Sequence, residues 1–445
     1  MVSCSILKSR PKMTSKTSNV CDEKRTPRRC ILWICLFIFL YATIYCILAQ
    51  PRFTYINKLK WIGSKYTEHF QPVVPGKSYV FVFSAFKLSS DNDKVSIVSI
   101  VDKYSPLHEF KCILRGKGNS TEKWTYATLE EYPESHNRRF SAAVFHCDVE
   151  QSQEPDTVSL VADGQQTPAN VLPIISESHP KRTFTVCVSP LHSRYSKAYQ
   201  LVEMVEVNLL LGADHFFFYN YSTNWNVDAV LNHYQSHGLA TVLQWPLPAV
   251  LQDDNQTEPI HYYGQIAMLN DCLKRNHGAS RHVIFHDLDE LIIPNSHKSW
   301  KDLLNSLPAN MSAYMFRSSY FHLEWPNVES NSKLVNKIAK RYKANSFLKQ
   351  YREERVFSPN TRSKYLVDPL QVHSVGIHRV WAFRDRGRQH FVPPNVALVH
   401  HYREGILERQ NSRLKDNSTL KFIAALNQIE ETWKLLPHIP LGPIT

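Results

Sequence analysis

Three acidic residues that directly follow a strongly apolar segment are the part of this sequence best suited to chemistry. The segment RHVIF at 281–285 predicts a buried strand, and Asp287, Asp289 and Glu290 come right after it. Buried strands rarely end in several acids unless a cation or hydrogen-bond donors compensate the charge. If the backbone is still extended there, Asp287 and Asp289 project to the same side. Two such carboxylates suit Mg²⁺ or Mn²⁺, which would in turn hold a diphosphate.

Two further acidic features are less specific. Glu290 either supports the metal ligands from behind or is an acid at the start of a helix. A second D-x-D pair, Asp91 and Asp93 in SSDNDK, lies in a turn-rich segment between predicted strands. We expect that copy to be a solvated turn, because short acidic and polar residues favour turns.

From Thr183 the pattern predicts strands and helices in alternation. The predicted strands are TFTVCVSPL, HFFFYNYS, LATVLQWPL and RHVIFHDLDELIIP, and the predicted helices are SKAYQLVEMVEVNLLLGA, VDAVLNHYQSHG and HYYGQIAMLNDCLKRNHG. Gly212 can end the first helix. This alternation indicates an α/β fold with a mostly parallel sheet, in which ligands bind at the carboxyl ends of the strands.

The segment before Thr183 predicts a different architecture. Short apolar runs between 78 and 163, separated by polar turns, are typical of a small antiparallel β domain. Residues 164–181 contain Pro168, Pro173 and Pro180 and predict a linker, so we place the β domain and its linker at 71–180 and the catalytic domain at 181–445. Near the C-terminus, LKFIAALNQIEETWKLL predicts an amphipathic helix that docks on that domain.

The charge of the 445-residue chain is unevenly distributed. The net charge is +12, and the first thirty residues, with eight Lys or Arg against two acids, account for half of it. The remainder is close to balanced for its length, which argues against a nucleic-acid-binding protein.

A membrane anchor explains the basic start of the chain. The nineteen residues 31–49, ILWICLFIFLYATIYCILA, carry no charge and are long enough to cross a bilayer as a helix. The preceding Arg28 and Arg29 favour a cytosolic N-terminus. We therefore expect a cytosolic tail at 1–30, an uncleaved anchor at 31–49 and a stem at 50–70. A cleaved signal peptide is the competing interpretation, which expects a shorter apolar core.

Sequons and cysteines agree with a lumen of the secretory pathway. Five N-glycosylation sequons follow the anchor, at Asn119, Asn220, Asn255, Asn310 and Asn417. We expect Cys112 and Cys147, both in strand-like runs, to form a disulfide. Cys187 and Cys272 either pair or are small buried apolar residues, and the sequence does not choose between these connectivities.

From Thr183 onward the chain resembles glycosyltransferase family 92, a group of Golgi enzymes with a GT-A-type, Rossmann-like fold. The matching segments are VCVSPLHSRY (186–195), LVEMVEVNLLLGADHFFFYNYS (201–222), HYYGQIAMLNDCLKR (261–275), IFHDLDELIIP (284–294) and ALVHHYRE (397–404). The resemblance implies a UDP-sugar donor, a divalent cation and inversion at the anomeric carbon. Characterised members of the family add β-galactose, commonly in 1-4 linkage, to galactose or core fucose on N-glycans.

The resemblance assigns roles around the acid pair. Asp287, Asp289 and His401 would bind the cation, Mn²⁺ or alternatively Mg²⁺, with His401 at the matching position of ALVHHYRE. Asp287 would also contact the donor ribose. His401 and its neighbour His400 end an apolar run, so the alternative is a structural strand-end histidine.

Four further residues are candidates for the donor and acceptor sites. Glu324, beside Trp325, is our candidate catalytic base, since an inverting transfer needs one base to take the acceptor proton. Arg194, in the loop with Pro190 and His192, could contact diphosphate or uracil. Gln265 could line the donor pocket, and Lys364 could reach phosphate. Each could equally be a solvated or structural residue.

The sequence thus predicts a single-pass type II Golgi membrane enzyme that transfers galactose from UDP-galactose to a glycoprotein glycan. Two alternatives stay open: a lectin-like luminal protein that binds glycans without transfer, and a transferase that uses another UDP-sugar. A cation-dependent hydrolase would need more metal ligands than the sequence offers.

Overall fold

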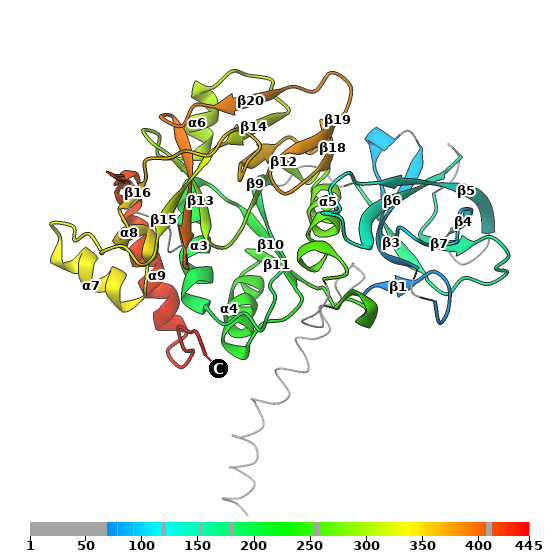
Figure 1. Cartoon of the computed structure of the whole chain (residues 1–445), viewed down its shortest axis with the longest axis horizontal. Helices are drawn as coiled ribbons and strands as arrows, with labels where there is room; N and C mark the ends of the chain where they lie inside the picture. Colours follow the sequence, from blue (N-terminus) through cyan, green and yellow to red (C-terminus); the bar gives the residue numbers. More distant parts are fainter. Residues whose placement is uncertain are drawn as a thin grey trace, which may run out of the picture. The chain divides into compact units, whose positions relative to one another are not determined.

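The computed structural model describes residues 69–444, apart from residues 78, 92, 117–121, 151–153, 178–181, 253–257 and 406–411. These residues belong to one compact unit (Figure 1). None of the helices in this part of the chain is long and apolar enough to span a membrane. The predicted tail at 1–30, the predicted anchor at 31–49 and nearly all of the predicted stem at 50–70 lie outside the described residues.

The first eight strands form a closed sheet. They are β1 (Gln71–Pro72), β2 (Val80–Lys87), β3 (Lys94–Asp102), β4 (Phe110–Arg115), β5 (Glu122–Glu131), β6 (Phe140–Asp148), β7 (Thr157–Ala162) and β8 (Leu172–Ser176). Their order is β1-β2-β3-β6-β5-β4-β7-β8, and β8 also pairs with β2, so the strands from β2 to β8 close into a barrel. All neighbours are antiparallel except β2 and β8.

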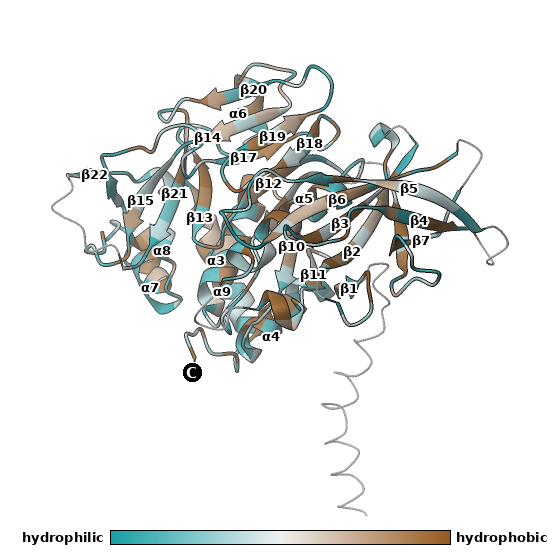
Figure 2. Ribbon diagram, turned by 45° about the vertical axis from the view of Figure 1, so that its right-hand side comes forward, coloured by the Kyte–Doolittle hydropathy of each residue, from teal (hydrophilic) through white to brown (hydrophobic). Residues whose placement is uncertain are grey.

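The sequence pattern did not predict two of the barrel strands. β8 lies within the predicted linker, because Pro173 makes the segment look unlike a strand. β5 is polar and exposed along most of its length, and in Figure 2 it is mostly pale and teal beside the brown β4. It is a strand because β4 and β6 bond to its backbone on both sides.

Residues from 182 onward form the second sheet and its helices. The strand order is β11-β10-β9-β12-β17-β14-β20. The four strands β9 (Arg182–Val188), β10 (His215–Asn220), β11 (Ala240–Gln244) and β12 (Ser280–His286) run parallel. β17 (Lys364–Val367) runs antiparallel to both of its neighbours, and β14 (Ala313–Phe316) pairs in parallel with β20 (Gln389–Val392). The predicted α/β class with a mostly parallel sheet is confirmed for the four strands that lead to the acidic residues.

Both faces of this sheet are buried, as expected of parallel strands. Alternate residues of β10 point to opposite faces. Phe216 and Phe218 pack in one core with α3 (Ala198–Leu211), α4 (Trp225–Ser236) and α9 (Ala424–Leu435). Phe217 and Tyr219 pack in another with α5 (Gln265–Arg275) and barrel side chains such as Phe83. The barrel therefore covers one face of the sheet.

The remaining elements complete the unit. A three-stranded sheet has the order β13-β21-β15, from β13 (Glu290–Pro294), β15 (Ser318–His322) and β21 (Ala397–Arg403). Two strand pairs are β16 (Tyr351–Glu353) with β22 (Arg413–Lys415), and β18 (Val372–Val375) with β19 (Val380–Phe383). The short helices are α6 (Trp300–Ser306), α7 (Lys333–Arg341) and α8 (Asn345–Leu348). The predicted amphipathic tail is confirmed as α9, which packs on α3, and Gly212 ends α3 with φ 112° as expected.

Both candidate disulfides are present. Cys112 on β4 and Cys147 on β6 are bonded, as predicted. Cys187 on β9 and Cys272 on α5 are also bonded, which resolves the alternative that the sequence left open.

The interpretation of Asp91 as part of a solvated turn is wrong. Asp91 ends a short 3₁₀ turn, Ser89–Asp91, and is 9% exposed. Its carboxylate forms an ion pair with Arg384 at 2.7 Å, and Arg384 follows β19 far along the chain. The sequence could not reveal Arg384 as the partner of Asp91. The acid is buried where the barrel meets the β18–β19 hairpin.

Candidate active site

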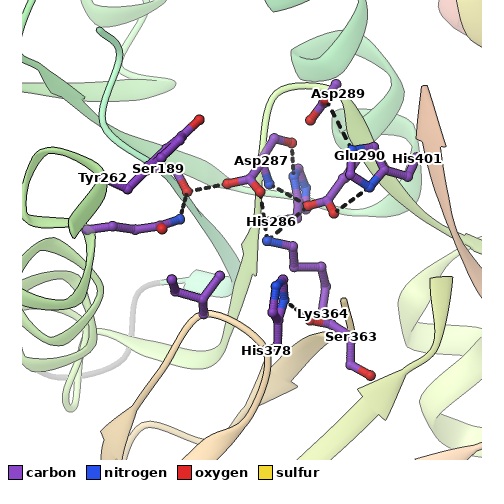
Figure 3. Close-up of polar contacts among 12 residues, drawn as sticks. Ser189, Tyr262, His286, Asp287, Asp289, Glu290, Ser363, Lys364, His378 and His401 are labelled. Atoms are coloured by element: carbon purple, nitrogen blue, oxygen red, sulfur yellow. Dashed lines mark hydrogen bonds and ion pairs between the residues drawn. The ribbon is translucent and has the colours of Figure 1, made fainter. Parts of the chain in front are cut away.

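The acidic segment after β12 is a tight turn rather than an extended strand. β12 ends at His286, and the backbone N–H of Glu290 donates to the carbonyl of Asp287 at 3.2 Å. The chain then enters β13 in a different sheet, so the single strand predicted for 281–294 is wrong. We call Asp287–Glu290 the acid turn. Because the backbone turns here, Asp287 and Asp289 engage different partners, as Figure 3 shows.

Asp287 is held by two segments from elsewhere in the chain. Lys364, the first residue of β17, places Nζ 2.8 Å from its Oδ2. Ser189, just after β9, donates its hydroxyl to Oδ1 and accepts a hydrogen bond from Gln265 Nε2 at 2.6 Å. Burial alone would raise the pKa of Asp287, but the lysine and these hydrogen bonds hold that pKa well below its usual range. Asp287 is therefore ionised and fixed in orientation.

Glu290 is the second partner of Lys364. Nζ lies 3.1 Å from Oε2, which also accepts the backbone N–H of Asp287 at 2.9 Å. Lys364 is 2% exposed and Glu290 1%. Burial opposes the charge of Lys364, yet the two acids raise its pKa above the ordinary value, whereas burial raises the pKa of Glu290. Glu290 begins a strand and supports the turn from behind, so the helix-start alternative is wrong.

Asp289 faces a histidine instead. Its Oδ2 lies 3.2 Å from His401 Nε2. His401 is opposite Glu290 in the β13–β21 pairing, and its Nδ1 lies 3.3 Å from Glu290 Oε1 without hydrogen-bond geometry. Burial opposes protonation, but Glu290 and Asp289 raise the pKa of His401. The neighbouring His400 faces Asp416, 3.8 Å away, and so points away from the acid turn.

The donor atoms of this pair suit a divalent cation. The carboxylate of Asp289 and the imidazole of His401 offer one oxygen and one nitrogen, a set compatible with Mn²⁺. His401 Nδ1 lies 3.3 Å from Glu290 Oε1, so this carboxylate is placed to orient the ring while Nε2 faces a cation. Asp287 fits less well as a direct ligand, because Ser189 and Lys364 occupy its two oxygens.

Three aromatic rings lie beside the acid turn, and we call His192, Tyr262 and Tyr263 the aromatic rim. His192 stacks on Tyr263 with ring centroids 4.2 Å apart, and its Nε2 lies 3.1 Å from the hydroxyl of Tyr262. Burial raises the pKa of Tyr262, and the negative charges of Asp287 and Asp289 raise it further.

The aromatic rim borders a cavity and is built on unusual backbone. The cavity, of about 160 Å³, is lined by the rim together with Leu251, Glu258, Pro259 and Ile260. Tyr262 and Tyr263 have φ of 41° and 57°, in the left-handed region where such residues are uncommon. Local strain of this kind clusters at functional sites. Sequence reasoning missed the two tyrosines as site residues, because it placed them inside a helix predicted at 261–278. The adjacent Gly264 was the signal that the helix begins only at Gln265.

The structure brings some of the predicted site residues together and leaves others apart. Asp287, Lys364 and Gln265 share one network, and Asp289 and His401 meet beside it. The side chain of Arg194 is exposed, while its backbone N–H donates to Ser222 Oγ at 3.0 Å. Glu324, on the turn after β15, accepts the backbone N–H of Gly405 at 2.6 Å and is exposed. The roles proposed for Arg194 and Glu324 stay predictions.

The sequons differ in their surroundings. Asn310 and Asn417 are exposed. Asn220 is half-buried, and its side-chain amide donates to Asp228 at 3.1 Å. Asn119 and Asn255 lie outside the described residues.

Comparison with known proteins identifies the family of this chain. Glycosyltransferase family 92 matches residues 182–434, more than half of the chain, so the protein belongs to that family. The chain is 24% identical over 230 residues to beta-1,4-galactosyltransferase galt-1 of Caenorhabditis elegans, covering 48% of this chain and 52% of that protein. It is 27% identical over 223 residues to glycosyltransferase family 92 protein F13G3.3 of the same organism, covering 48% and 43%. The chain thus spans about half the length of these relatives.

Solved structures resemble this chain weakly. A structure of glucosyl-3-phosphoglycerate synthase from Mycobacterium tuberculosis with phosphoglyceric acid is 13% identical, covers 58% of this chain and 81% of that chain, and has a TM-score of 0.23. A mycobacterial protein of 15% identity covers 58% and 76%, with a TM-score of 0.25. Scores this low carry no argument about fold or function.

Proposed function

We propose that this protein is a metal-dependent, inverting glycosyltransferase that moves galactose from UDP-galactose to a terminal galactose or fucose of N-glycans, in β1-4 linkage. Membership of glycosyltransferase family 92 supports sugar transfer. The choice of galactose and of the linkage rests on a relative named beta-1,4-galactosyltransferase, at 24% identity. The observation that carries the proposal is the acid turn at the carboxyl end of β12, with Asp289 facing His401 and Asp287 fixed by Lys364.

The cation would be held by Asp289 and His401. When bound there, Mn²⁺ would neutralise the charge that develops on the leaving diphosphate. Lys364 keeps Asp287 ionised, and Ser189 orients it. Held in this way, Asp287 is placed to accept hydrogen bonds from donor hydroxyls, which agrees with the ribose contact expected from the resemblance.

The aromatic rim is suited to a flat heterocycle. The stacked His192 and Tyr263 present ring faces and edges beside the acid turn, and aromatic surfaces of this kind bind planar groups. We assign the nucleotide base to the cavity of about 160 Å³ that the rim borders. Gln265 supports the site indirectly, by fixing the hydroxyl of Ser189.

Inversion requires a single displacement. The acceptor hydroxyl oxygen attacks the anomeric carbon, the bond to the UDP oxygen breaks, and a base takes the hydroxyl proton. We keep Glu324 as the candidate base. The backbone N–H of Gly405 lowers the pKa of Glu324, so its carboxylate is ionised and able to accept the proton.

We also propose a Golgi location with a single-pass type II topology. The uncharged segment at 31–49 after a basic tail, together with five sequons, supports this arrangement. The disulfides Cys112–Cys147 and Cys187–Cys272 agree with an oxidising compartment. An epitope at each end of the chain, probed with and without permeabilising Golgi membranes, tests the topology. Exposure of the C-terminal epitope to the cytosol would contradict it.

The transfer reaction is tested with the full chain purified in detergent. UDP release is measured with Mn²⁺ across a panel of UDP-sugars, with and without a galactose-ended or fucose-ended acceptor. We expect acceptor-dependent release with UDP-galactose. The Asp289→Asn variant should lose this release while it keeps its circular dichroism and unfolding midpoint. Asp385→Asn, an exposed turn acid, is the matched control and should retain it.

Three outcomes would change the proposal. Release with another UDP-sugar alone would replace galactose as the donor. Undiminished turnover in Asp289→Asn would remove the metal assignment. Silence across the panel, combined with binding to a glycan array, would favour the glycan-binding alternative.

A further inference from the structure

Three potential metal ligands meet outside the acid turn, where the barrel contacts the β18–β19 hairpin. Glu130 lies on β5, His146 on β6 and His373 on β18. One ligand atom from each lies within 4.8 Å of the other two. Glu130 Oε2 is 3.2 Å from His146 Nε2, and the two Glu130 oxygens are 3.0 and 3.1 Å from His373 Nε2.

The protons around His146 are determined by a buried neighbour. Asp91 accepts the hydroxyl of Ser96 at 2.7 Å. Burial alone would raise the pKa of Asp91, but Lys274 and Arg384 outweigh it and lower that pKa to about 2, so Asp91 is an anion. The one hydroxyl hydrogen of Ser96 is therefore directed to Asp91.

This leaves one role for each nitrogen of His146. Ser96 Oγ lies 3.1 Å from His146 Nδ1 and has no hydrogen left to give, so Nδ1 must donate to it. Nε2 is then the ring nitrogen that faces the Glu130 carboxylate, and without a hydrogen it would present a lone pair to it. Two electron-rich atoms at 3.2 Å repel each other unless a cation lies between them, either a proton or a metal ion.

The donor set is one that suits a metal ion. Two imidazole nitrogens and one carboxylate oxygen form a ligand set that zinc prefers, with a water molecule in the fourth position. Glu130 is 42% exposed and His373 24%, so water can reach the cluster. The Asp91–Ser96–His146 chain has the form of the outer hydrogen bonds that orient zinc-binding histidines.

We propose that Glu130, His146 and His373 form a zinc site that fastens the barrel to the β18–β19 hairpin. The contact continues beside it, where Glu134 accepts the backbone N–H of Ile377 and the indole of Trp381, each at 3.0 Å. The hairpin also exchanges two hydrogen bonds with Asn270 of α5 through the backbone of Val375. A zinc ion here thus connects β5 and β6 to the helix that begins at Gln265, without sharing a residue with the acid turn.

The test uses the full chain in detergent with the acid turn disabled. In an Asp289→Asn/His401→Gln background, chelator-stripped protein is titrated with Zn²⁺ against a chromophoric competitor. We expect about one tightly bound zinc per chain. Adding His146→Ala or His373→Ala should abolish it, whereas adding His108→Ala, an exposed barrel histidine, should not. Ser96→Ala should weaken binding about 10- to 100-fold, because it removes the hydrogen bond that orients His146.

A second measurement keeps the proposal testable if a histidine variant unfolds. Co²⁺ bound in place of zinc should give visible absorption bands in the same background, and His373→Gln should remove them while the circular dichroism is unchanged. Absence of tight zinc binding in the background protein would show that protons, not a metal, bridge the cluster, and would overturn the proposal. Equal zinc binding after His146→Ala and His373→Ala would overturn it as well.

Discussion

Lys364, which is buried, and Asp287, whose side chain is 29% exposed, form an ion pair across two adjacent strands, with Nζ 2.8 Å from Oδ2. Lys364 begins β17, and Asp287 follows the last residue of β12, so the antiparallel pairing of these strands brings the two residues together. The same ammonium group contacts Glu290 at 3.1 Å. One lysine thereby pairs with two acids of the acid turn.

The Lys364→Met variant should be destabilised by about 3–5 kcal/mol, because it leaves the buried Glu290 and the half-buried Asp287 without their cation. Both acids can take up protons at low pH, so the loss of unfolding free energy should be larger at pH 8 than at pH 5. Chemical denaturation at the two pH values measures this. Lys415→Met, in the exposed β22, should be nearly neutral.

A second substitution separates stability from activity at this lysine. Lys364→Met/Glu290→Gln removes one of the two uncompensated charges and should recover part of the lost stability. Transfer should stay impaired, because Asp287 still lacks its cation. If the double variant is no more stable than Lys364→Met, the two acids do not share the lysine in the way the distances indicate.

The His401→Gln variant should need more metal to work. It removes the imidazole that faces Asp289 at 3.2 Å, so the Mn²⁺ concentration for half-maximal UDP release should rise at least about tenfold. The unfolding midpoint without metal is measured in parallel, to separate metal affinity from folding. His438→Gln, an exposed histidine near the C-terminus, is the control. An unchanged Mn²⁺ requirement in His401→Gln would contradict the ligand assignment.

The aromatic rim should act on donor affinity. Tyr262→Leu removes the ring that contacts His192, and we expect KM for the UDP-sugar to rise about three- to tenfold with a smaller change in kcat. Tyr262→Phe keeps the ring and should lie closer to the original protein. Tyr104→Leu, at a tyrosine that is 78% exposed, provides the control. A change in kcat alone would place Tyr262 outside the donor site.

A buried acid in α3 should make stability depend on pH. Burial raises the pKa of Glu203 from 4.5 to about 7, although Ser346 donates to it from both its backbone N–H and its hydroxyl. Between these pH values the folded chain holds a proton that the unfolded chain has lost. The contribution of Glu203 to the unfolding free energy is therefore complete below pH 4.5 and is lost as the pH rises through about 7.

The Glu203→Gln variant should remove this dependence. From pH 5 to pH 8 the original protein should lose about 2–3 kcal/mol of unfolding free energy more than the variant, whose amide can still accept from Ser346. Urea denaturation at both pH values gives the difference. Glu431→Gln, an exposed acid in α9, should follow the original protein. Parallel pH profiles for Glu203→Gln and the original protein would show that Glu203 is ionised in the fold throughout.

Local patterns were sufficient for the elements that lead to the site. The helix ending at Gly212, the buried strands β9, β10 and β12 and the amphipathic α9 follow from apolar periodicity and the position of glycine. The same reasoning placed the acids after β12, because a change from apolar to acidic residues is visible in the sequence itself.

Tertiary structure alone decided which partner each acid meets. Ser189, Gln265, Asp287 and Lys364 come from four segments far apart in the chain, and no spacing rule links them. The polar β5 and the proline-containing β8 are strands because their neighbours satisfy their backbone hydrogen bonds. Apolar periodicity indicates which residues of a segment face the core. Which distant segments pair with one another depends on the folded arrangement of the strands. For that reason the sequence determined that the acids after β12 need a compensating charge, and the fold determined that Lys364 and His401 provide it.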